Sequence, residues 1–136
     1  MFLRRPPRPK TIRLRTPNQR AGDAAEDTAT AHLTAHGLRI LARNVRYADG
    51  ELDIVALDGD TLVFVEVRLR SSDSHGGAFA SVDTAKRRRV TRAAQHFLAA
   101  RARGGARDLP PCRFDVIAAD ANRVIAWVKD AFTAEE

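Results

Sequence analysis

The sequence contains one cysteine, Cys112, among its 136 residues. An intramolecular disulfide is therefore excluded, and a zinc site built from cysteines is nearly so. No run of apolar residues approaches the roughly 18 that a membrane-spanning helix needs. The first ten residues, MFLRRPPRPK, include basic side chains but no apolar stretch behind them, which argues against a secretory signal. We therefore expect a cytoplasmic protein with no membrane partner.

Acidic residues are missing from residues 1–20, which hold seven of the 23 lysines and arginines. The rest of the chain is almost balanced in charge, so the net charge of +6 belongs mainly to this segment. Several prolines within it oppose a long helix. We predict a disordered basic arm over 1–20 and a single domain over 21–136. The arm either binds a polyanion by counterion release or serves only solubility.

Helical and extended patterns alternate along the predicted domain. Two helices and five strands are expected, with three strands between the helices and two after them. The helices cover Asp23–His36 and a segment from a cap at Ser81 or Asp83 to about Arg103, and the strands cover Leu38–Arg46, Glu51–Leu57, Thr61–Arg70, Arg113–Ala119 and Val124–Val128. The order α-β-β-β-α-β-β predicts an α/β sandwich with a mixed central sheet of about five strands flanked by helices.

Two acids lie inside apolar strands, where an unpaired charge is costly. Asp53 interrupts ELDIVAL, and Glu66 interrupts LVFVEVRLR two residues before Arg68. If the two strands pair through the turn at Asp58–Asp60, the carboxylates can approach each other. Close carboxylates repel unless a cation lies between them, and hard oxygen ligands suit Mg²⁺ or Mn²⁺. The alternative is a structural cluster in which Arg68 neutralises both acids.

Two further acids are predicted near this pair. Glu26 precedes Leu33 by seven positions, which places it on the helix stripe that faces the sheet. It either joins the strand acids or is simply favoured by the dipole of the first helical turn. Glu51 either supports the strand acids or pairs with Arg46 across the neighbouring turn.

The second predicted helix carries a dense row of basic side chains. Arg88, Arg89 and Arg92 point away from its apolar stripe. Lys86 lies at the edge of the stripe, close enough to reach the acids. The three arginines form either a solvated face or a contact surface for a phosphate backbone.

Several ordered motifs together resemble the YraN-like proteins, a bacterial family with a restriction-endonuclease-like fold. The resemblance covers residues 22–132 and does not include the basic arm. The matching stretches are G-x-x-A-E-x-x-A-x-x-x-L-x-x-x-G at Gly22–Gly37, N-x-R at Asn44–Arg46, GELDIVA at Gly50–Ala56, FVEVRLR at Phe64–Arg70, K-x-x-R at Lys86–Arg89, RFDVI at Arg113–Ile117 and W-V-K-D-A-F at Trp127–Phe132.

The resemblance places the chain in the PD-(D/E)xK nuclease superfamily, which includes archaeal-type Holliday-junction resolvases. It implies that Glu26, Asp53 and Glu66 correspond to the helix acid, the strand acid and the acid of the E-x-K motif. In those nucleases the acids hold one or two Mg²⁺ ions, which activate water and stabilise the charge on the phosphodiester.

The sequence departs from the family at one position. The family usually has E-V-K, whereas this chain has Glu66-Val67-Arg68. Arginine stays charged and cannot accept a proton from water, although it can hold the attacking water or stabilise developing charge. Lys86 is the candidate for the missing amine.

The sequence therefore predicts a Mg²⁺- or Mn²⁺-dependent nuclease-like protein that hydrolyses phosphodiesters in DNA and selects by structure rather than by base sequence. The predicted catalytic residues are Glu26, Asp53, Glu66, Arg68 and Lys86, the predicted metal ligands are Asp53, Glu66 and Glu26, and the predicted DNA contacts are Arg88, Arg89 and Arg92. The alternative is a protein of the same fold that binds nucleic acid or a partner without catalysis, as the arginine at position 68 favours. A homodimer is compatible with both functions.

Overall fold

The computed structural model describes residues 15–70, 83–105 and 109–134. Its elements are α1 (Pro17–Ala35), β1 (Arg39–Tyr47), β2 (Gly50–Asp58), β3 (Thr61–Leu69), α2 (Thr84–Arg103), β4 (Cys112–Ala119) and β5 (Val124–Phe132). The predicted α/β class and element order are confirmed. The strands match their predicted ends within one residue, except that β5 continues from Val128 to Phe132.

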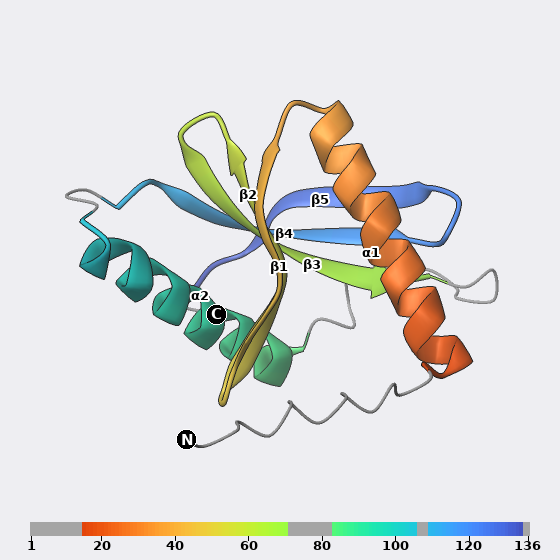
Figure 1. The fold of residues 1–136 in the computed structure, drawn as a ribbon, viewed down its shortest axis with the longest axis horizontal. Coiled ribbons are helices and arrows are strands. Elements are labelled where there is room, and N and C mark those ends of the chain that lie inside the picture. The colour runs from red at the N-terminus through yellow and green to blue at the C-terminus, as the bar shows by residue number, and fades with distance from the viewer. Residues whose placement is uncertain (1–14, 71–82, 106–108, 135–136) are drawn as a thin grey trace, which may run out of the picture.

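The five strands form one mixed sheet in the order β1-β2-β3-β4-β5. β3 and β4 run parallel because α2 crosses between them, and the other neighbours are antiparallel. Figure 1 shows α1 and α2 on opposite sides of this sheet. Apolar residues of α1 pack on one face and those of α2 on the other, which gives two separate cores. Central strands covered on both faces explain the near-continuous apolar character of β2 and β3.

The start of α1 differs from its prediction. The helix begins at Pro17 rather than at Asp23, so residues 17–20 do not belong to a disordered arm. Pro17 is compatible with a helix here because a first-turn proline has no N–H to lose. Thr16 and Gln19 form a capping box in front of it. Residues 1–14 of the predicted arm lie outside the described residues.

The start of α2 agrees with one of its two predicted caps. The Asp83 side chain accepts a hydrogen bond from the backbone N–H of Lys86 at 2.8 Å. The other predicted cap, Ser81, lies outside the described residues. Within the described ranges, neither α1 nor α2 is long and apolar enough to cross a membrane.

The turn between β1 and β2 packs directly on α2. A Cβ built on Gly50 would lie 2.0 Å from the carbonyl oxygen of Arg89, so only glycine permits this approach. The contact is reinforced by the Nε2 of His96, which lies 2.9 Å from Oδ1 of Asp49. Gly50 therefore fixes α2 beside the start of β2, where Glu51 and Asp53 follow.

Candidate active site

The two strand acids meet where β2 and β3 separate. The ladder between these strands ends at the Ile54–Val65 pair, and Asp53 and Glu66 are the next residues of the two strands. On its other edge, β3 pairs with β4 from Leu62 to Leu69, so this pairing continues past the point where β2 leaves. Oδ2 of Asp53 accepts a hydrogen bond from the backbone N–H of Val67 at 2.9 Å. We call this place the strand fork; it is defined by Asp53 and Glu66.

The strand fork coincides with a break in the alternation of β2. Leu52 belongs to the core under α2, whereas Ile54 belongs to the core under α1, although a regular strand would point both to the same face. In the adjacent strand β1, Asn44 has a φ of 52°, in the left-handed region that asparagine tolerates better than most residues. The irregular backbone turns Asp53 toward Glu66.

Glu66 is the more buried of the two acids, with 3% of its surface exposed. Burial, together with the charge of Asp53, raises its pKa to about 8 against the opposing effect of Lys86. Its Oε1 lies 3.3 Å from Nζ of Lys86. Its Oε2 is buried and receives no hydrogen bond from the described residues. A buried acceptor without a donor is costly, so this oxygen is a natural position for a proton or a metal ion.

Lys86 reaches the strand fork from the first turn of α2, as its place on the helix predicts. Besides Glu66, its Nζ contacts Oε1 of Glu51 at 3.4 Å. Burial lowers the pKa of Lys86, but the charges of Glu66 and Asp53 outweigh it and the net shift is upward. Lys86 is therefore held in its charged form. Glu51 therefore pairs with Lys86 and not with Arg46, although Glu51 and Arg46 are cross-strand neighbours.

Glu26 lies on α1 beside the fork and is largely buried. Its Oε1 accepts hydrogen bonds from Nε of Arg43 at 3.1 Å and Nδ2 of Asn44 at 2.9 Å. The alternative of a first-turn acid is wrong, because α1 starts nine residues before Glu26. Burial raises the pKa of Glu26, hydrogen bonding to Arg43 opposes this, and the nearby charge of Asp53 adds to the rise.

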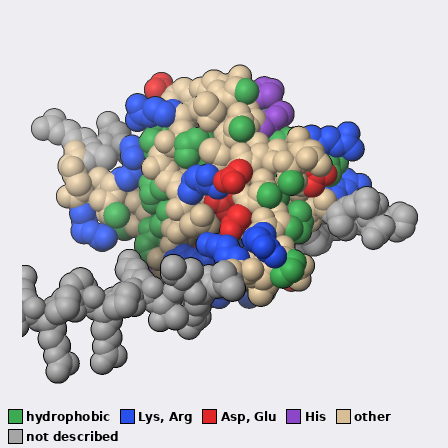
Figure 2. Space-filling model, turned by 45° about the vertical axis from the view of Figure 1, so that its right-hand side comes forward, with side chains coloured by type: hydrophobic (Ala, Val, Ile, Leu, Met, Phe, Trp, Pro, Cys, Tyr) green, Lys and Arg blue, Asp and Glu red, His purple; other side chains and the backbone are tan. Residues whose placement is uncertain are grey.

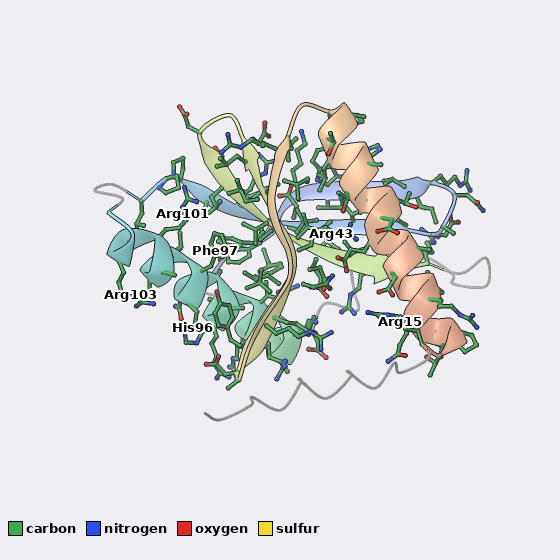
Figure 3. The ribbon with its side chains drawn as sticks, in the orientation of Figure 1. Arg15, Arg43, His96, Phe97, Arg101 and Arg103 are labelled. Atoms are coloured by element: carbon green, nitrogen blue, oxygen red, sulfur yellow. The ribbon has the colours of Figure 1, made fainter. Side chains whose placement is uncertain are left out.

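Arg43 and Asn44 were not predicted as part of this site. Arg43 also donates from Nη2 to Oδ1 of Asp27 at 2.7 Å, so its guanidinium joins two acids of α1 to β1. Figure 3 shows Arg43 between β1 and α1. The N-x-R motif at Asn44 was visible in the sequence, but its contact with Glu26 spans 18 positions and no periodicity reveals it.

The donor set suits Mg²⁺ better than a metal ion that takes three or more of its ligands from the protein. Among the described residues, no three Asp, Glu, His or Cys side chains lie close enough to hold a metal together. Mg²⁺ commonly uses one or two carboxylates and completes its shell with water and substrate phosphate. The Asp53–Glu66 pair, with the unbonded Oε2 of Glu66, fits that requirement. Glu26 is already engaged by Arg43 and Asn44, and its ligation remains a prediction.

The predicted basic residues occupy different places around the fork. Arg68 is half-buried on β3, and its charge lowers the pKa of Glu66. Arg88, Arg89 and Arg92 are exposed on α2, beginning two residues after Lys86. On the face drawn in Figure 2, acidic side chains lie near the centre with lysine and arginine side chains beside them.

A second buried acid shows what a purely structural carboxylate looks like in this fold. Asp115 on β4 accepts hydrogen bonds from Nε of Arg113 at 3.0 Å and Nε1 of Trp127 at 2.9 Å, and from the backbone N–H of Asp130 at 3.0 Å. Both of its oxygens accept hydrogen bonds, whereas one oxygen of Glu66 accepts none from the described ranges of the chain. Trp127, which donates one of these hydrogen bonds, is half-buried.

The pKa of Glu66 predicts how stability depends on pH. Because the folded pKa of about 8 exceeds the ordinary 4.5, the folded state binds this proton more tightly than the unfolded state between those values. In metal-free buffer, the free energy of unfolding should therefore fall as pH rises through this window, by about 5 kcal/mol. Glu66→Gln should remove this component in denaturant melts, whereas Asp60→Asn, in the distant β2–β3 turn, should preserve it. An unchanged slope in Glu66→Gln would contradict the assignment.

The chain is similar to proteins of one family over nearly its whole length. Residues 25–119 match the profile of the "Uncharacterised protein family UPF0102". A UPF0102 protein of Janthinobacterium sp. (strain Marseille) is 47% identical over 126 residues, which cover 93% of this chain and 98% of the relative. UPF0102 proteins of Pseudomonas entomophila (strain L48) and Ralstonia nicotianae are 50% and 52% identical, covering 82% and 84% of this chain and 92% and 87% of the relatives. The chain therefore belongs to the UPF0102 family, in agreement with the resemblance that its motifs carry.

Proposed function

We propose that this protein is a metal-dependent nuclease that hydrolyses phosphodiester bonds in DNA and selects its substrate by structure. The observation that carries the proposal is the pair of carboxylates at the strand fork. Asp53 and Glu66 are close enough for each other's charge to matter, and one oxygen of Glu66 is buried without a donor among the described residues. A fold gains no stability from such a pair, so its presence favours a ligand of opposite charge.

The side chains around the fork have distinct roles in this proposal. Asp53 and Glu66 would hold Mg²⁺ or Mn²⁺, which would neutralise phosphate charge and make water a better nucleophile. Lys86 keeps positive charge beside the reacting phosphate and is the only lysine amine at the fork among the described residues. Arg68 adds charge from β3 but cannot move a proton at neutral pH. Glu26 orients β1 through Asn44, and Arg88, Arg89 and Arg92 contact the DNA backbone.

The second candidate function is DNA binding without catalysis on the same fold. Arg68 favours it, because the position usually holds a lysine in the family that the motifs resemble. A titration of Mg²⁺ or Mn²⁺ against linear, flapped and four-way DNA separates the two functions. Cleavage that depends on the ion and is faster on branched DNA supports the nuclease, whereas binding without cleavage supports the second function.

The Arg68→Lys variant sharpens this distinction. If Lys86 supplies the amine, the natural protein cleaves and the variant changes the rate by less than about tenfold, because the charge at position 68 is conserved. If catalysis has been lost with the lysine, cleavage appears only in the variant. Rates should be measured over pH 6–9 on the same flapped DNA, with Arg123→Lys in the β4–β5 turn as the matched control.

The basic row of α2 should control DNA affinity through charge. Replacing Arg88, Arg89 and Arg92 together with glutamine should weaken binding on every sequence and reduce the slope of log K against log salt by up to about 3. Arg123→Gln should leave the slope nearly unchanged. Deleting residues 1–14, which leaves the Thr16 cap intact, tests the arm in the same assay. A triple variant with the wild-type slope would place the DNA elsewhere.

A further inference from the structure

A cavity of about 290 Å³ opens beside Asp53 on the side of the sheet that α1 covers. We call it the fork cavity. Its lining includes Gly22 and Glu26 from α1, Arg46 from β1, Asp53 from β2, and Val67 and Leu69 from β3. It thus adjoins the strand fork without being part of the Asp53–Glu66 contact itself.

Gly22 is an unusual residue for its position. It is the sixth residue of α1, inside the helix, where glycine is the least favourable residue apart from proline. A Cβ at Gly22 would meet no atom within 4 Å, and its backbone is not left-handed, so neither packing nor conformation requires glycine. Gly22 precedes Glu26 by four positions and therefore shares its face of the helix. The remaining effect of the glycine is to keep the fork cavity open.

Arg46 gives the fork cavity a group for binding an anion, since Arg15, which also lines it, pairs with Asp23 at 2.8 Å. It is exposed and makes no ion pair in the described part of the chain. Its cross-strand neighbour Glu51 contacts Lys86 instead. A guanidinium binds a phosphate through two parallel N–H donors. Val67 and Leu69 supply an apolar wall, and 46% of the surface of Leu69 is exposed.

We propose that the fork cavity receives a single unpaired nucleotide of the DNA strand to be cleaved, and that Gly22 preserves the space for it. Its phosphate lies at Arg46 and its sugar against Val67 and Leu69, next to Asp53. The volume is at the lower end for ligand pockets, so it accommodates one nucleotide and not a base pair. This inference rests on the proposed function and deepens it: the substrate class is DNA with a nucleotide outside the stack, which avoids the cost of unpairing.

Filling the cavity tests this assignment directly. Gly22→Leu adds a side chain whose Cβ would meet no atom within 4 Å and replaces a poor helix former with a good one, so its Tm should not fall. Ala31→Leu, on an exposed part of the same helix, is the matched control. Binding of a fluorescein-labelled single-stranded oligothymidylate is measured in EDTA by anisotropy, and cleavage of flapped DNA is measured with Mg²⁺.

The expected result is a Kd for the oligothymidylate raised about tenfold or more in Gly22→Leu, together with loss of flap cleavage. Ala31→Leu should match the wild type in both assays. Arg46→Gln, which removes the anion contact without adding volume, should weaken binding in the same direction. Arg46→Gln also serves as the test if Gly22→Leu does not fold. If Arg46→Gln binds the oligothymidylate with the same Kd as the wild type, the inference is overturned.

The two proposals fail in different ways. If the wild type cleaves flapped DNA and a folded Gly22→Leu cleaves and binds equally well, the cavity assignment is overturned while the nuclease stands. If the wild type cleaves no substrate with either ion, the proposed nuclease fails and binding in EDTA decides alone. In that case, weaker binding by Gly22→Leu supports the assignment of the fork cavity as a nucleotide site, and unchanged binding overturns it.

Discussion

The Asp53→Asn variant is expected to lose divalent-ion binding and at least about a hundredfold of any DNA cleavage, the scale on which removal of one electrostatic stabiliser slows an enzyme. Asparagine keeps the shape of the side chain but removes one of the two charges at the strand fork. A neutral amide is a weak ligand for Mg²⁺ beside a single carboxylate. Ion binding is measured by calorimetry, and cleavage is measured on flapped DNA.

The same variant should not be destabilised in metal-free buffer. The amide oxygen at position 53 can still accept the hydrogen bond from Val67, and the amide N–H₂ can donate to Glu66. The pKa of Glu66 should then fall from about 8, because the charge of Asp53 no longer raises it. Above pH 8, the free energy of unfolding of the variant should exceed that of the wild type by about 1 kcal/mol. The difference should be smaller at pH 5, where Glu66 is protonated in the wild type as well.

The opposite sign distinguishes a structural ion-pair cluster from a metal site. If Asp53 served mainly to neutralise Arg68, its loss would leave a half-buried cation and reduce stability by up to about 3–5 kcal/mol. Asp60→Asn is the matched control, since it makes the same chemical change in an exposed turn. A clear fall in Tm for Asp53→Asn, with ion binding intact, would favour the ion-pair cluster over the nuclease site.

The parts of the site that the sequence could predict follow from local rules. Apolar runs separated by Asp58-Gly59-Asp60 indicated that β2 and β3 form a hairpin, and this turn brings Asp53 toward Glu66. The helical period placed Lys86 at the edge of the apolar stripe of α2, where its contact with Glu66 was found. Both inferences need only the geometry of one strand pair or one helix.

The remaining parts depend on departures from regular geometry and on distant contacts. A period of two predicts that Leu52 and Ile54 share a face, and the irregularity at Asp53 breaks that rule. Its counterpart in β1 is the left-handed Asn44, and an asparagine in an extended segment only permits that conformation without requiring it. The contact of Arg43 with Glu26 joins β1 to α1 and has no periodic signature.

Lys86→Met is expected to reduce cleavage by about a hundredfold or more, because it removes the positive charge and the only lysine amine at the fork among the described residues. Its effect on stability should depend on pH. Without its partner, the pKa of Glu66 rises above 8, since the charge of Lys86 lowers it in the wild type. At pH 6 Glu66 is neutral and the loss should be small. At pH 9 the wild type keeps the ion pair and the variant does not, so the loss should approach about 3 kcal/mol.

Lys86→Arg separates the role of the charge from that of the amine in this result, and Lys129→Met is the matched control. Lys86→Arg keeps a charge beside Glu66 and should retain stability at pH 9, but it cannot exchange a proton at neutral pH. Cleavage that fails in both position-86 variants therefore assigns the amine a part in proton movement, whereas cleavage that survives in Lys86→Arg assigns charge alone. Lys129→Met, over the Trp127 ring on β5, should cleave like the wild type. Wild-type cleavage by Lys86→Met would reduce Lys86 to a counterion of Glu66 and leave Arg68 as the cation at the reacting phosphate.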